Sequence, residues 1–317
     1  MTSYYGRPVI KEPVWTWEIP AYLFTGGIGG ASAVLSLAAR IAGNEPLART
    51  SLYVGAAADA VSPPLLISDL GRPERFLNML RVFKVTSPMN VGSWILLVSG
   101  GASTTAALLE KAGRLKRLKL AAEVVSALTG GPLATYTGGL FADTAVPVWH
   151  EARRELPYLF GASAAASAGA ASALFLEPED AGPARRLAVG AAIAELGVAR
   201  RMENQLGPFL AEPYRTGTAG ALTRASKALV AAGAGILALR GKRSRRAAVA
   251  GSGLLLAGEV MLRFAVWRAG KQSARDPKYT VEPQRQRVAA RAESGRGGRG
   301  PRDAATSDVL VGRGTRT

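Results

Sequence analysis

The sequence contains no cysteine and a single histidine among its 317 residues. Without thiolates, the chain has no side chains for disulfides, for iron–sulfur ligation or for a cysteine-based zinc site. The lone His150 cannot supply the two ligands of a bis-histidine haem. No phosphate-binding P-loop and no Ser/His/Asp arrangement is apparent, and the glycines of GGIGG (26–30) lie inside an apolar run, whereas a dinucleotide-binding turn follows a strand.

Acidic residues are also scarce, with 23 Asp and Glu against 40 Lys and Arg and a formal net charge of +17. Such an excess is a feature of nucleic-acid-binding proteins as well. Here, however, the basic residues gather in short loops between apolar runs and in the segment after Lys271, as membrane topology predicts. We therefore expect membrane lipid as a partner, and no nucleic acid.

Long apolar runs dominate the chain, of which 48% is hydrophobic. A membrane-spanning helix needs about 20 predominantly apolar residues. Eight runs meet this requirement, and the first follows a polar N-terminal segment with no evident cleavable signal. The runs are 19–40, 47–68, 91–109, 120–142, 157–176, 186–206, 219–239 and 247–268. They predict an all-α integral membrane protein with eight transmembrane helices, although the Ala- and Gly-rich fifth and seventh runs also fit buried helices of a soluble protein.

This pattern divides the chain into three parts. Residues 1–18 form an N-terminal extramembrane segment, 19–270 the transmembrane domain, and 271–317 a basic C-terminal tail. From Gln284 onward the composition is mainly Arg, Gly, Ala and Ser, which predicts disorder.

An even number of spans places both termini on one side of the membrane. The N-terminal segment, 69–90, 143–156, 207–218 and the C-terminal segment then share one face, which we call the motif-bearing face. Loops on the opposite face, which include 110–119 and 240–246, carry the larger number of Lys and Arg. The positive-inside rule therefore favours termini outside the cell.

The stretch 69–94, DLGRPERFLNMLRVFKVTSPMNVGSW, joins the second and third apolar runs. Gly71 and Pro73 end the preceding helix, because proline lacks an N–H and restricts the residue before it. After them, Phe76, Met79 and Phe83 recur at helical spacing. This pattern predicts a short helix in the membrane interface, and a connecting loop is the alternative.

Four stretches of this sequence resemble the NrfD/PsrC family, the membrane subunits of polysulfide-reductase-like complexes. They are DLGRPERF with SPMNVGSW (69–94), WTWEIPAYLFTGGIGGASAVL (15–35), TYTGGLFADTAVPVW (135–149) and LRFAVWRAGKQSARDP (262–277). The resemblance implies two four-helix bundles in a prokaryotic cell membrane. It also implies binding of menaquinone or ubiquinone, a ferredoxin-like Fe–S partner subunit and a molybdopterin catalytic subunit. Electrons would pass directly between the partner and the quinone, since the chain has no means of holding haem or Fe–S.

The resemblance also points to a quinone site. Matching motifs assign quinone contacts to Tyr136 and to the start of the first helix, where Trp17 and Glu18 lie. A tyrosine hydroxyl is a suitable donor to a quinone carbonyl. The resemblance also implies a histidine-type residue of the first helix at the quinone site, and no such residue is apparent in this sequence. Gly138 either admits a flat ring or serves close helix packing.

Ionisable residues carry the remaining hypotheses. Glu18, Asp143 and His150 lie near the motif-bearing face and are candidates for proton exchange with the quinone. Asp59 and Glu195 lie deep in their predicted spans, where a carboxyl group is either a structural partner of arginine or part of a proton path.

Three further residues on the connecting stretch, Asp69, Arg72 and Arg75, are candidates for the partner interface, and a pairing of Asp69 with Arg72 would fix the loop.

Two other functions fit the same composition. A passive membrane anchor would tolerate substitution of Tyr136 and Glu18. A secondary transporter would use the buried carboxylates and would show helices broken at corresponding places in two repeats. Pro63 and Pro64 could break the second span, but no counterpart is evident in the other half.

Overall fold

The computed structural model describes residues 8–297, and within that range every regular element is a helix. Each predicted apolar run lies on one long helix. These are α1 (Glu18–Ile41), α2 (Glu45–Asp69), α4 (Pro88–Ala112), α5 (Lys116–Ala142), α7 (Leu156–Phe175), α8 (Gly182–Leu210), α9 (Gly217–Leu239) and α10 (Arg245–Arg275). Four further elements are α3 (Arg75–Met79), α6 (Pro147–Glu151), the 3-10 turn η1 (Glu212–Tyr214) and α11 (Lys278–Gly297).

Five helices of the described chain are long and apolar enough to cross a membrane, namely α1, α4, α7, α9 and α10. The other long helices of the body, α2, α5 and α8, have the necessary length but do not reach this apolarity. Asp59 of α2, Glu123 of α5 and Glu195 of α8 are all buried within the protein. The described residues thus form an all-helical body typical of a multi-pass membrane protein, and these three carboxyl groups face its interior.

Local signals define several helix ends. Asn44, Ser87 and Ser244 each accept a hydrogen bond from a backbone N–H three residues later, at the starts of α2, α4 and α10. These side chains satisfy N–H groups that have no partner within the helix. Gly113 ends α4 in the left-handed conformation that favours glycine, with φ of 64°. The boundaries thus follow from residues visible in the sequence.

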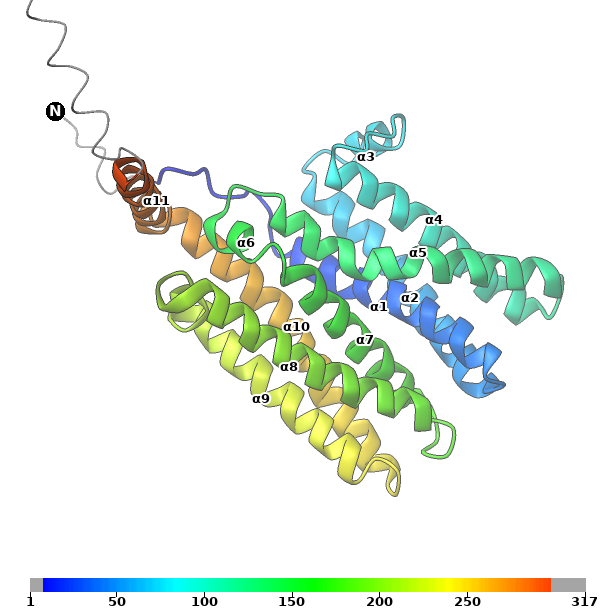
Figure 1. Cartoon of the computed structure of the whole chain (residues 1–317). Helices are drawn as coiled ribbons and strands as arrows, with labels where there is room; N and C mark the ends of the chain where they lie inside the picture. Colours follow the sequence, from blue (N-terminus) through cyan, green and yellow to red (C-terminus); the bar gives the residue numbers. More distant parts are fainter. Residues whose placement is uncertain (1–7, 298–317) are drawn as a thin grey trace, which may run out of the picture.

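The long helices of the body lie side by side with nearly parallel axes (Figure 1). Helix α1 is central and packs against α2, α5, α7 and α10. Helix α4 packs against α2 and α5, while α8 and α9 lie on the other side, against α7 and α10. At Gly30 a Cβ atom would lie only 2.3 Å from the Gly130 carbonyl oxygen. Glycine at this position therefore permits the close approach of α1 and α5.

At one end of the body, an ion cluster joins four of these helices. Arg40 at the end of α1 lies 2.8 Å from Glu45 of α2, 3.6 Å from Glu110 of α4 and 2.6 Å from Glu123 of α5. One guanidinium group thus links four chain segments at the level where they leave the apolar core.

The opposite end carries the connections that the sequence predicted to share one face. Figure 1 shows α3, α6 and α11 at this end, together with the N-terminal segment. Hydrogen bonds join Thr16 to Asp69, and Lys271 to the Trp15 carbonyl oxygen. The Trp15 ring stacks on Phe141, with centroids 5.5 Å apart. We call this the motif-bearing end.

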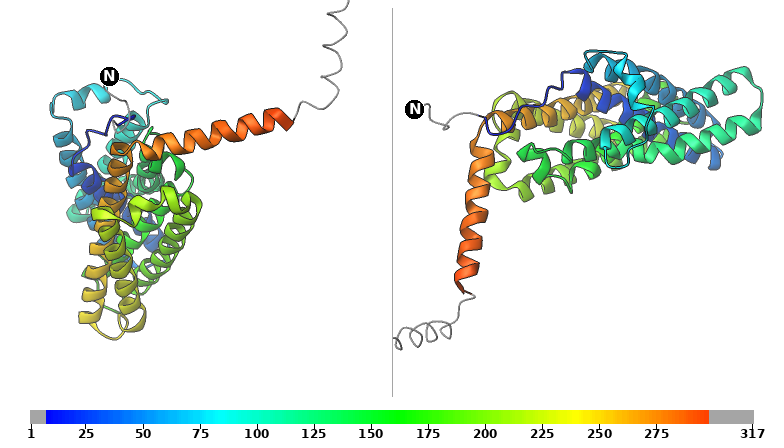
Figure 2. Two further views of the ribbon diagram at one scale, coloured as in Figure 1. Left: turned by 90° about the vertical axis from the view of Figure 1, so that its left-hand side faces the viewer. Right: turned by 90° about the horizontal axis from the view of Figure 1, so that it is seen from above.

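Helix α11 runs across the axes of the long helices and projects beyond them (Figure 2). Its start is held by the Lys278–Glu212 pair at 2.9 Å, and Arg287 reaches Glu151 at 2.8 Å. Helix α11 includes residues 284–297 of the segment whose composition predicts disorder. Residues 298–317 of the predicted tail lie outside the described residues, as do 1–7 of the N-terminal segment.

The predicted interfacial helix after Pro73 is shorter than expected, because α3 ends at Met79. The Asn90 side chain donates to the Met79 carbonyl oxygen at 2.5 Å and accepts from the Lys84 N–H at 2.7 Å. These bonds engage backbone groups that a longer helix would need, so residues 80–87 form a connecting loop.

Candidate functional site

Two tyrosines meet between α1 and α5 below the motif-bearing end. The hydroxyl groups of Tyr22 and Tyr136 are hydrogen-bonded to each other. Tyr22 is fully buried and Tyr136 is half-buried. The Tyr136 ring lies against Gly92 of α4, where an added Cβ would be 2.1 Å from the ring. The glycine of SPMNVGSW thus leaves the space that the Tyr136 side chain occupies.

Two carboxyl groups, Glu18 on α1 and Asp69 on α2, lie nearer the motif-bearing end than the tyrosine pair. The Thr16 N–H donates to Asp69 at 2.8 Å, and the Thr16 hydroxyl is hydrogen-bonded to both Asp69 and Glu18. A hydroxyl carries one proton, so it donates to one of these carboxyl groups at a time. Glu18 precedes Tyr22 by four residues, which places both on one face of α1. The start of α1 and the end of α2 therefore share a polar cluster beside the tyrosine pair.

Deeper between α1, α2 and α4 lies a buried carboxyl group. Asp59 accepts a hydrogen bond from the Ser103 hydroxyl at 2.6 Å, while its second oxygen has no hydrogen-bond partner in the described structure. At Gly29 a Cβ would lie 2.0 Å from that second oxygen. Between Asp59 and the tyrosines, the hydroxyls of Thr25 and Ser62 are 2.8 Å apart. Polar groups therefore occur at intervals from the motif-bearing end to mid-membrane depth.

Proline shapes the backbone beside Asp59. Pro63 has no N–H, so it leaves the Asp59 carbonyl oxygen without its usual partner four residues later. The helix nevertheless continues through both prolines to Asp69, and the predicted break of the second span is absent from α2.

A second buried cluster lies on the other side of α1, among α7, α8 and α10. Glu195 and Glu259 are neighbouring buried carboxyl groups, and Ser163 donates a hydrogen bond to Glu259. Two adjacent carboxyl groups avoid mutual repulsion when one of them holds a proton. Arg263 lies over the Phe160 ring at 4.0 Å and donates to the Phe160 carbonyl oxygen at 3.1 Å. The cluster thus combines a carboxyl pair with a buried guanidinium group.

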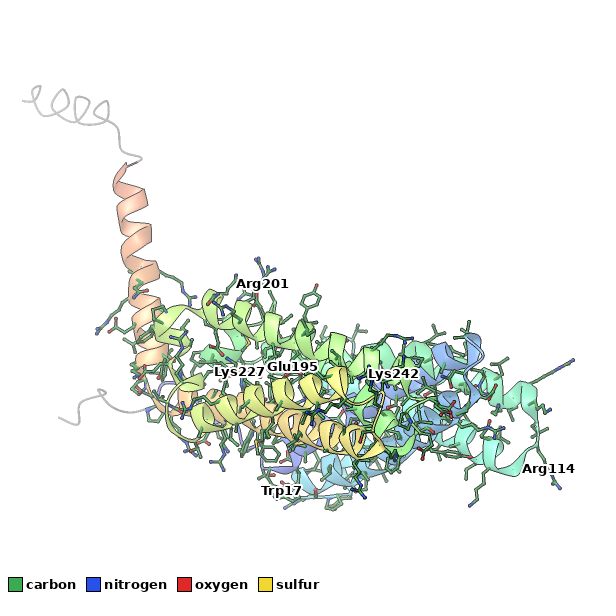
Figure 3. All side chains as sticks on the ribbon, turned by 90° about the horizontal axis from the view of Figure 1, so that it is seen from below. Trp17, Arg114, Glu195, Arg201, Lys227 and Lys242 are labelled. Atoms are coloured by element: carbon green, nitrogen blue, oxygen red, sulfur yellow. The ribbon has the colours of Figure 1, made fainter. Side chains whose placement is uncertain are left out.

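A small cavity separates Glu195 from the ion pair of Glu203 and Lys227, whose atoms are 2.5 Å apart. Its volume is about 10 Å³, close to the minimum for one water molecule. Buried, unpartnered hydroxyls of Tyr214 and Ser226 belong to residues that also line it. Figure 3 shows Glu195 and Lys227 along the α8–α9 side of the body.

The structure brings together only some of the predicted quinone-site residues. Tyr136 and Glu18 belong to the same region, whereas Asp143 and His150 are exposed and form no side-chain hydrogen bond with either of them. Trp17 is 56% exposed.

Close packing explains Gly138. A Cβ at this position would lie 2.5 Å from the Leu156 carbonyl oxygen. The backbone of α7 therefore occupies the space beside Gly138 that a quinone ring would need.

The predicted partner-interface residues separate into two kinds. Asp69 accepts hydrogen bonds from Thr16 and forms no ion pair with Arg72 in the described structure. Arg72 and Arg75 are exposed on the loop around α3. The predicted proton-path residues, Asp59 and Glu195, belong to separate clusters on opposite sides of α1.

Sequence reasoning missed the partners of several of these residues. Tyr22 was not selected, although its spacing of four from Glu18 indicated a shared helix face. Arg263 was not selected either, and only its position within the last apolar run pointed to an inward-facing cation. Glu259 has the same signal, since it is an ionisable residue inside the last apolar run, whereas Ser103 and Ser163 carry no local signal that distinguishes them from other polar residues in these helices.

Comparison with known families and proteins gives two findings. A family model described as polysulfide reductase matches residues 1–275, most of the chain and all of the long helices up to the end of α10. No curated protein matches the sequence. Helix α11 lies beyond the matched residues.

Proposed function

The chain belongs to the polysulfide reductase family of NrfD-type membrane proteins, and from this premise we propose that it is the quinone-reactive membrane subunit of a multi-subunit oxidoreductase. Eight helices cross a prokaryotic cell membrane, with the termini outside, in two four-helix bundles. The packing of α1 with α2 and α5, and of α10 with α7 and α9, supports this division. So does the Arg40 cluster, which joins the four helices of the first bundle.

The tyrosine pair is the observation that carries the proposal. Two hydroxyls hold two protons, and their mutual hydrogen bond uses one. The other proton is available to the carbonyl oxygen of a menaquinone or ubiquinone, which supplies two-electron redox chemistry when bound. Tyr136 positions this oxygen and Tyr22 orients the Tyr136 hydroxyl. Glu18, one turn nearer the motif-bearing end on the same face as Tyr22, takes up or releases the proton.

The electron donor or acceptor is a partner subunit. The chain has no cysteine and one exposed histidine, so we assign the metal centres to a ferredoxin-like Fe–S subunit and a molybdopterin catalytic subunit. The motif-bearing end is the docking face, because the quinone site lies directly below it. Arg72 and Arg75 there are exposed cations that suit an acidic partner surface.

Quinone content and turnover test the proposal. The complex is purified in mild detergent, its lipid extract is assayed for quinone, and oxidation or reduction of a menaquinone analogue is followed. Tyr136→Phe is expected to lower turnover at least about tenfold, by loss of a positioned hydrogen bond. Tyr53→Phe, a half-exposed tyrosine elsewhere on α2, is the matched control and is expected to retain activity. Absence of quinone and of turnover in a complex with intact Fe–S clusters would instead indicate a passive anchor.

The buried carboxyl clusters favour a second function, the movement of protons across the membrane during turnover. Asp59 with Ser103 and Glu195 with Glu259 each place a carboxyl group inside the apolar body. Such groups are costly unless they serve structure or transport. Proteoliposomes with a pH-sensitive dye test this function: Asp59→Asn and Glu259→Gln should reduce proton movement per quinone reduced. Unchanged proton movement in both variants would remove the hypothesis.

A further inference from the structure

A groove on the outer side of α7 and α8 is separate from both the tyrosine pair and the buried carboxyl clusters. Its volume is about 610 Å³, and its lining residues are Arg154, Glu155, Tyr158, Val198 and Arg201. The first two precede α7, Tyr158 lies in its first turn, and the last two lie on α8. Figure 3 places Arg201 at the outer margin of the body, away from Glu195 and Lys227.

The two arginines of the groove have no protein partner. Arg154 and Arg201 are exposed, and neither forms an ion pair or a side-chain hydrogen bond within residues 8–297. Some other cations are engaged, as Lys227 is by Glu203 and Arg287 by Glu151, whereas Arg72 and Arg75 on the loop around α3 are exposed as well. Two free guanidinium groups facing one groove form a site for a phosphate, which arginine binds through paired N–H groups.

Glu155 adds a group of opposite charge. The residue as a whole is 4% exposed, and its side chain forms neither a hydrogen bond nor an ion pair within residues 8–297. Because Glu155 lines the groove, its carboxylate can accept a hydrogen bond from a ligand there. The groove therefore presents two positive groups and one negative group to its occupant.

The depth of the groove matches the membrane interface. Tyr158, at the start of a helix long and apolar enough to span a membrane, is 72% exposed. Tyrosine is enriched where lipid headgroups meet the hydrocarbon core. Ile193, about two turns deeper on α8, is also exposed, as expected for a helix that contacts acyl chains. The groove thus lies at headgroup level on a lipid-contacting flank.

We propose that this groove binds a phospholipid with a primary ammonium headgroup, phosphatidylethanolamine. Arg154 and Arg201 hold the phosphate, and Glu155 accepts hydrogen bonds from the ammonium group. Basic pockets beside membrane helices bind lipid headgroups in this way. The carboxylate is the selective element, since the choline headgroup has no N–H to donate and the glycerol headgroup has no positive charge.

Native mass spectrometry of the purified, delipidated complex tests this assignment. Short-chain phosphatidylethanolamine, phosphatidylglycerol and phosphatidylcholine are titrated separately, with free phosphoethanolamine and inorganic phosphate as further probes. The wild-type complex is expected to prefer the ethanolamine lipid over the choline lipid by about tenfold, as for one charge-assisted hydrogen bond. Binding of the free phosphates with no gain from the lipid would overturn the lipid assignment.

Variants identify the groove as the site. Arg201→Gln and Arg154→Gln should each weaken binding of all three lipids by about tenfold, whereas Glu155→Gln should abolish the preference for ethanolamine and retain phosphate binding. Arg243→Gln removes the same charge from an exposed position at the opposite end of the body and should leave binding unchanged. Equal binding by wild type and Arg201→Gln would overturn the proposal. Circular dichroism of each variant establishes that its helices are intact.

Because neither Tyr22 nor Tyr136 lines the groove, these variants also separate the two proposals. Loss of lipid preference with retained quinone turnover would leave the proposed function intact.

Discussion

Tyr22 and Tyr136 are 114 positions apart in the sequence, and their hydroxyl groups are hydrogen-bonded to each other between α1 and α5. Each hydroxyl therefore limits the directions in which the other can donate. Gly92 of α4 packs against the Tyr136 ring, which occupies the space that a side chain at position 92 would fill. Three helices thus cooperate in orienting one phenolic group.

This relationship predicts that Tyr22→Phe impairs quinone turnover, although Tyr22 is buried behind Tyr136. Loss of the mutual hydrogen bond, about 0.5–1.5 kcal/mol, leaves the Tyr136 hydroxyl free to rotate and should reduce turnover about three- to tenfold. Steady-state kinetics with a menaquinone analogue measure the effect. A Tyr22→Phe complex as active as the wild type would show that Tyr136 needs no orienting partner.

Gly92→Ala should displace the Tyr136 ring, because the new methyl group would overlap it. Overpacking of this kind costs about 1–3 kcal/mol, and turnover should fall together with the thermal midpoint. Gly101→Ala, on the same helix with no atom within 4 Å of the new Cβ, is the matched control. If both variants behaved alike, a general effect of alanine on α4 would be the explanation.

We predict that the absence of a side chain at Gly30 is essential for the close packing of α1 against α5. Gly30→Ala places a methyl group 2.3 Å from the Gly130 carbonyl oxygen, so the helices must separate. We expect a loss of about 1–3 kcal/mol in stability. Thermal unfolding in detergent measures this loss, with Gly131→Ala on α5 as a control that meets open space. Equal midpoints for the two variants would contradict the predicted packing role.

Arg263→Met should destabilise the protein by about 3–5 kcal/mol, because it removes the cation beside the Glu195–Glu259 pair. The double variant Glu259→Gln with Arg263→Met should recover part of this loss, since it also removes one ionisable carboxyl group. Thermal midpoints of the single and double variants provide the comparison. A double variant less stable than Arg263→Met alone would argue that the three groups do not act as one cluster.

The N-terminal segment should detach in acid. Arg275 and Lys271 lower the pKa of Glu12 below its ordinary value of 4.5, Arg275 having the larger effect. The stabilisation is therefore present above pH 4.5 and is lost as the pH falls through the lower, folded-state pKa. Hydrogen exchange of residues 8–17 at pH 7 and in acid measures the attachment.

Glu12→Gln should raise exchange in the same residues already at pH 7, whereas Glu179→Gln, an exposed glutamate without an ion pair in the described chain, should not. Exchange that is identical in Glu12→Gln and wild type would mean that the segment is held mainly by other contacts, such as the stacking of Trp15 on Phe141.

The sequence by itself determined the eight long helices and the location of the motifs at one end. Both depend on local properties, namely the lengths of the apolar runs, N-cap residues such as Asn44 at the start of α2, and the alternation of direction between successive helices. The composition from Gln284 onward predicts disorder, whereas α11 of the structure extends to Gly297 and Arg287 forms an ion pair with Glu151.

Only the tertiary structure decided which polar residues meet. Glu195 and Glu259 are separated by the whole of α9, and nothing in either segment specifies the helix rotations that bring these two buried carboxyl groups together. The pairing of Tyr22 with Tyr136 likewise depends on the close packing that Gly30 and Gly92 permit. Hydrophobic periodicity places residues at a depth in the membrane, whereas neighbours across helices follow from steric fit, and that fit is a property of the assembled bundle.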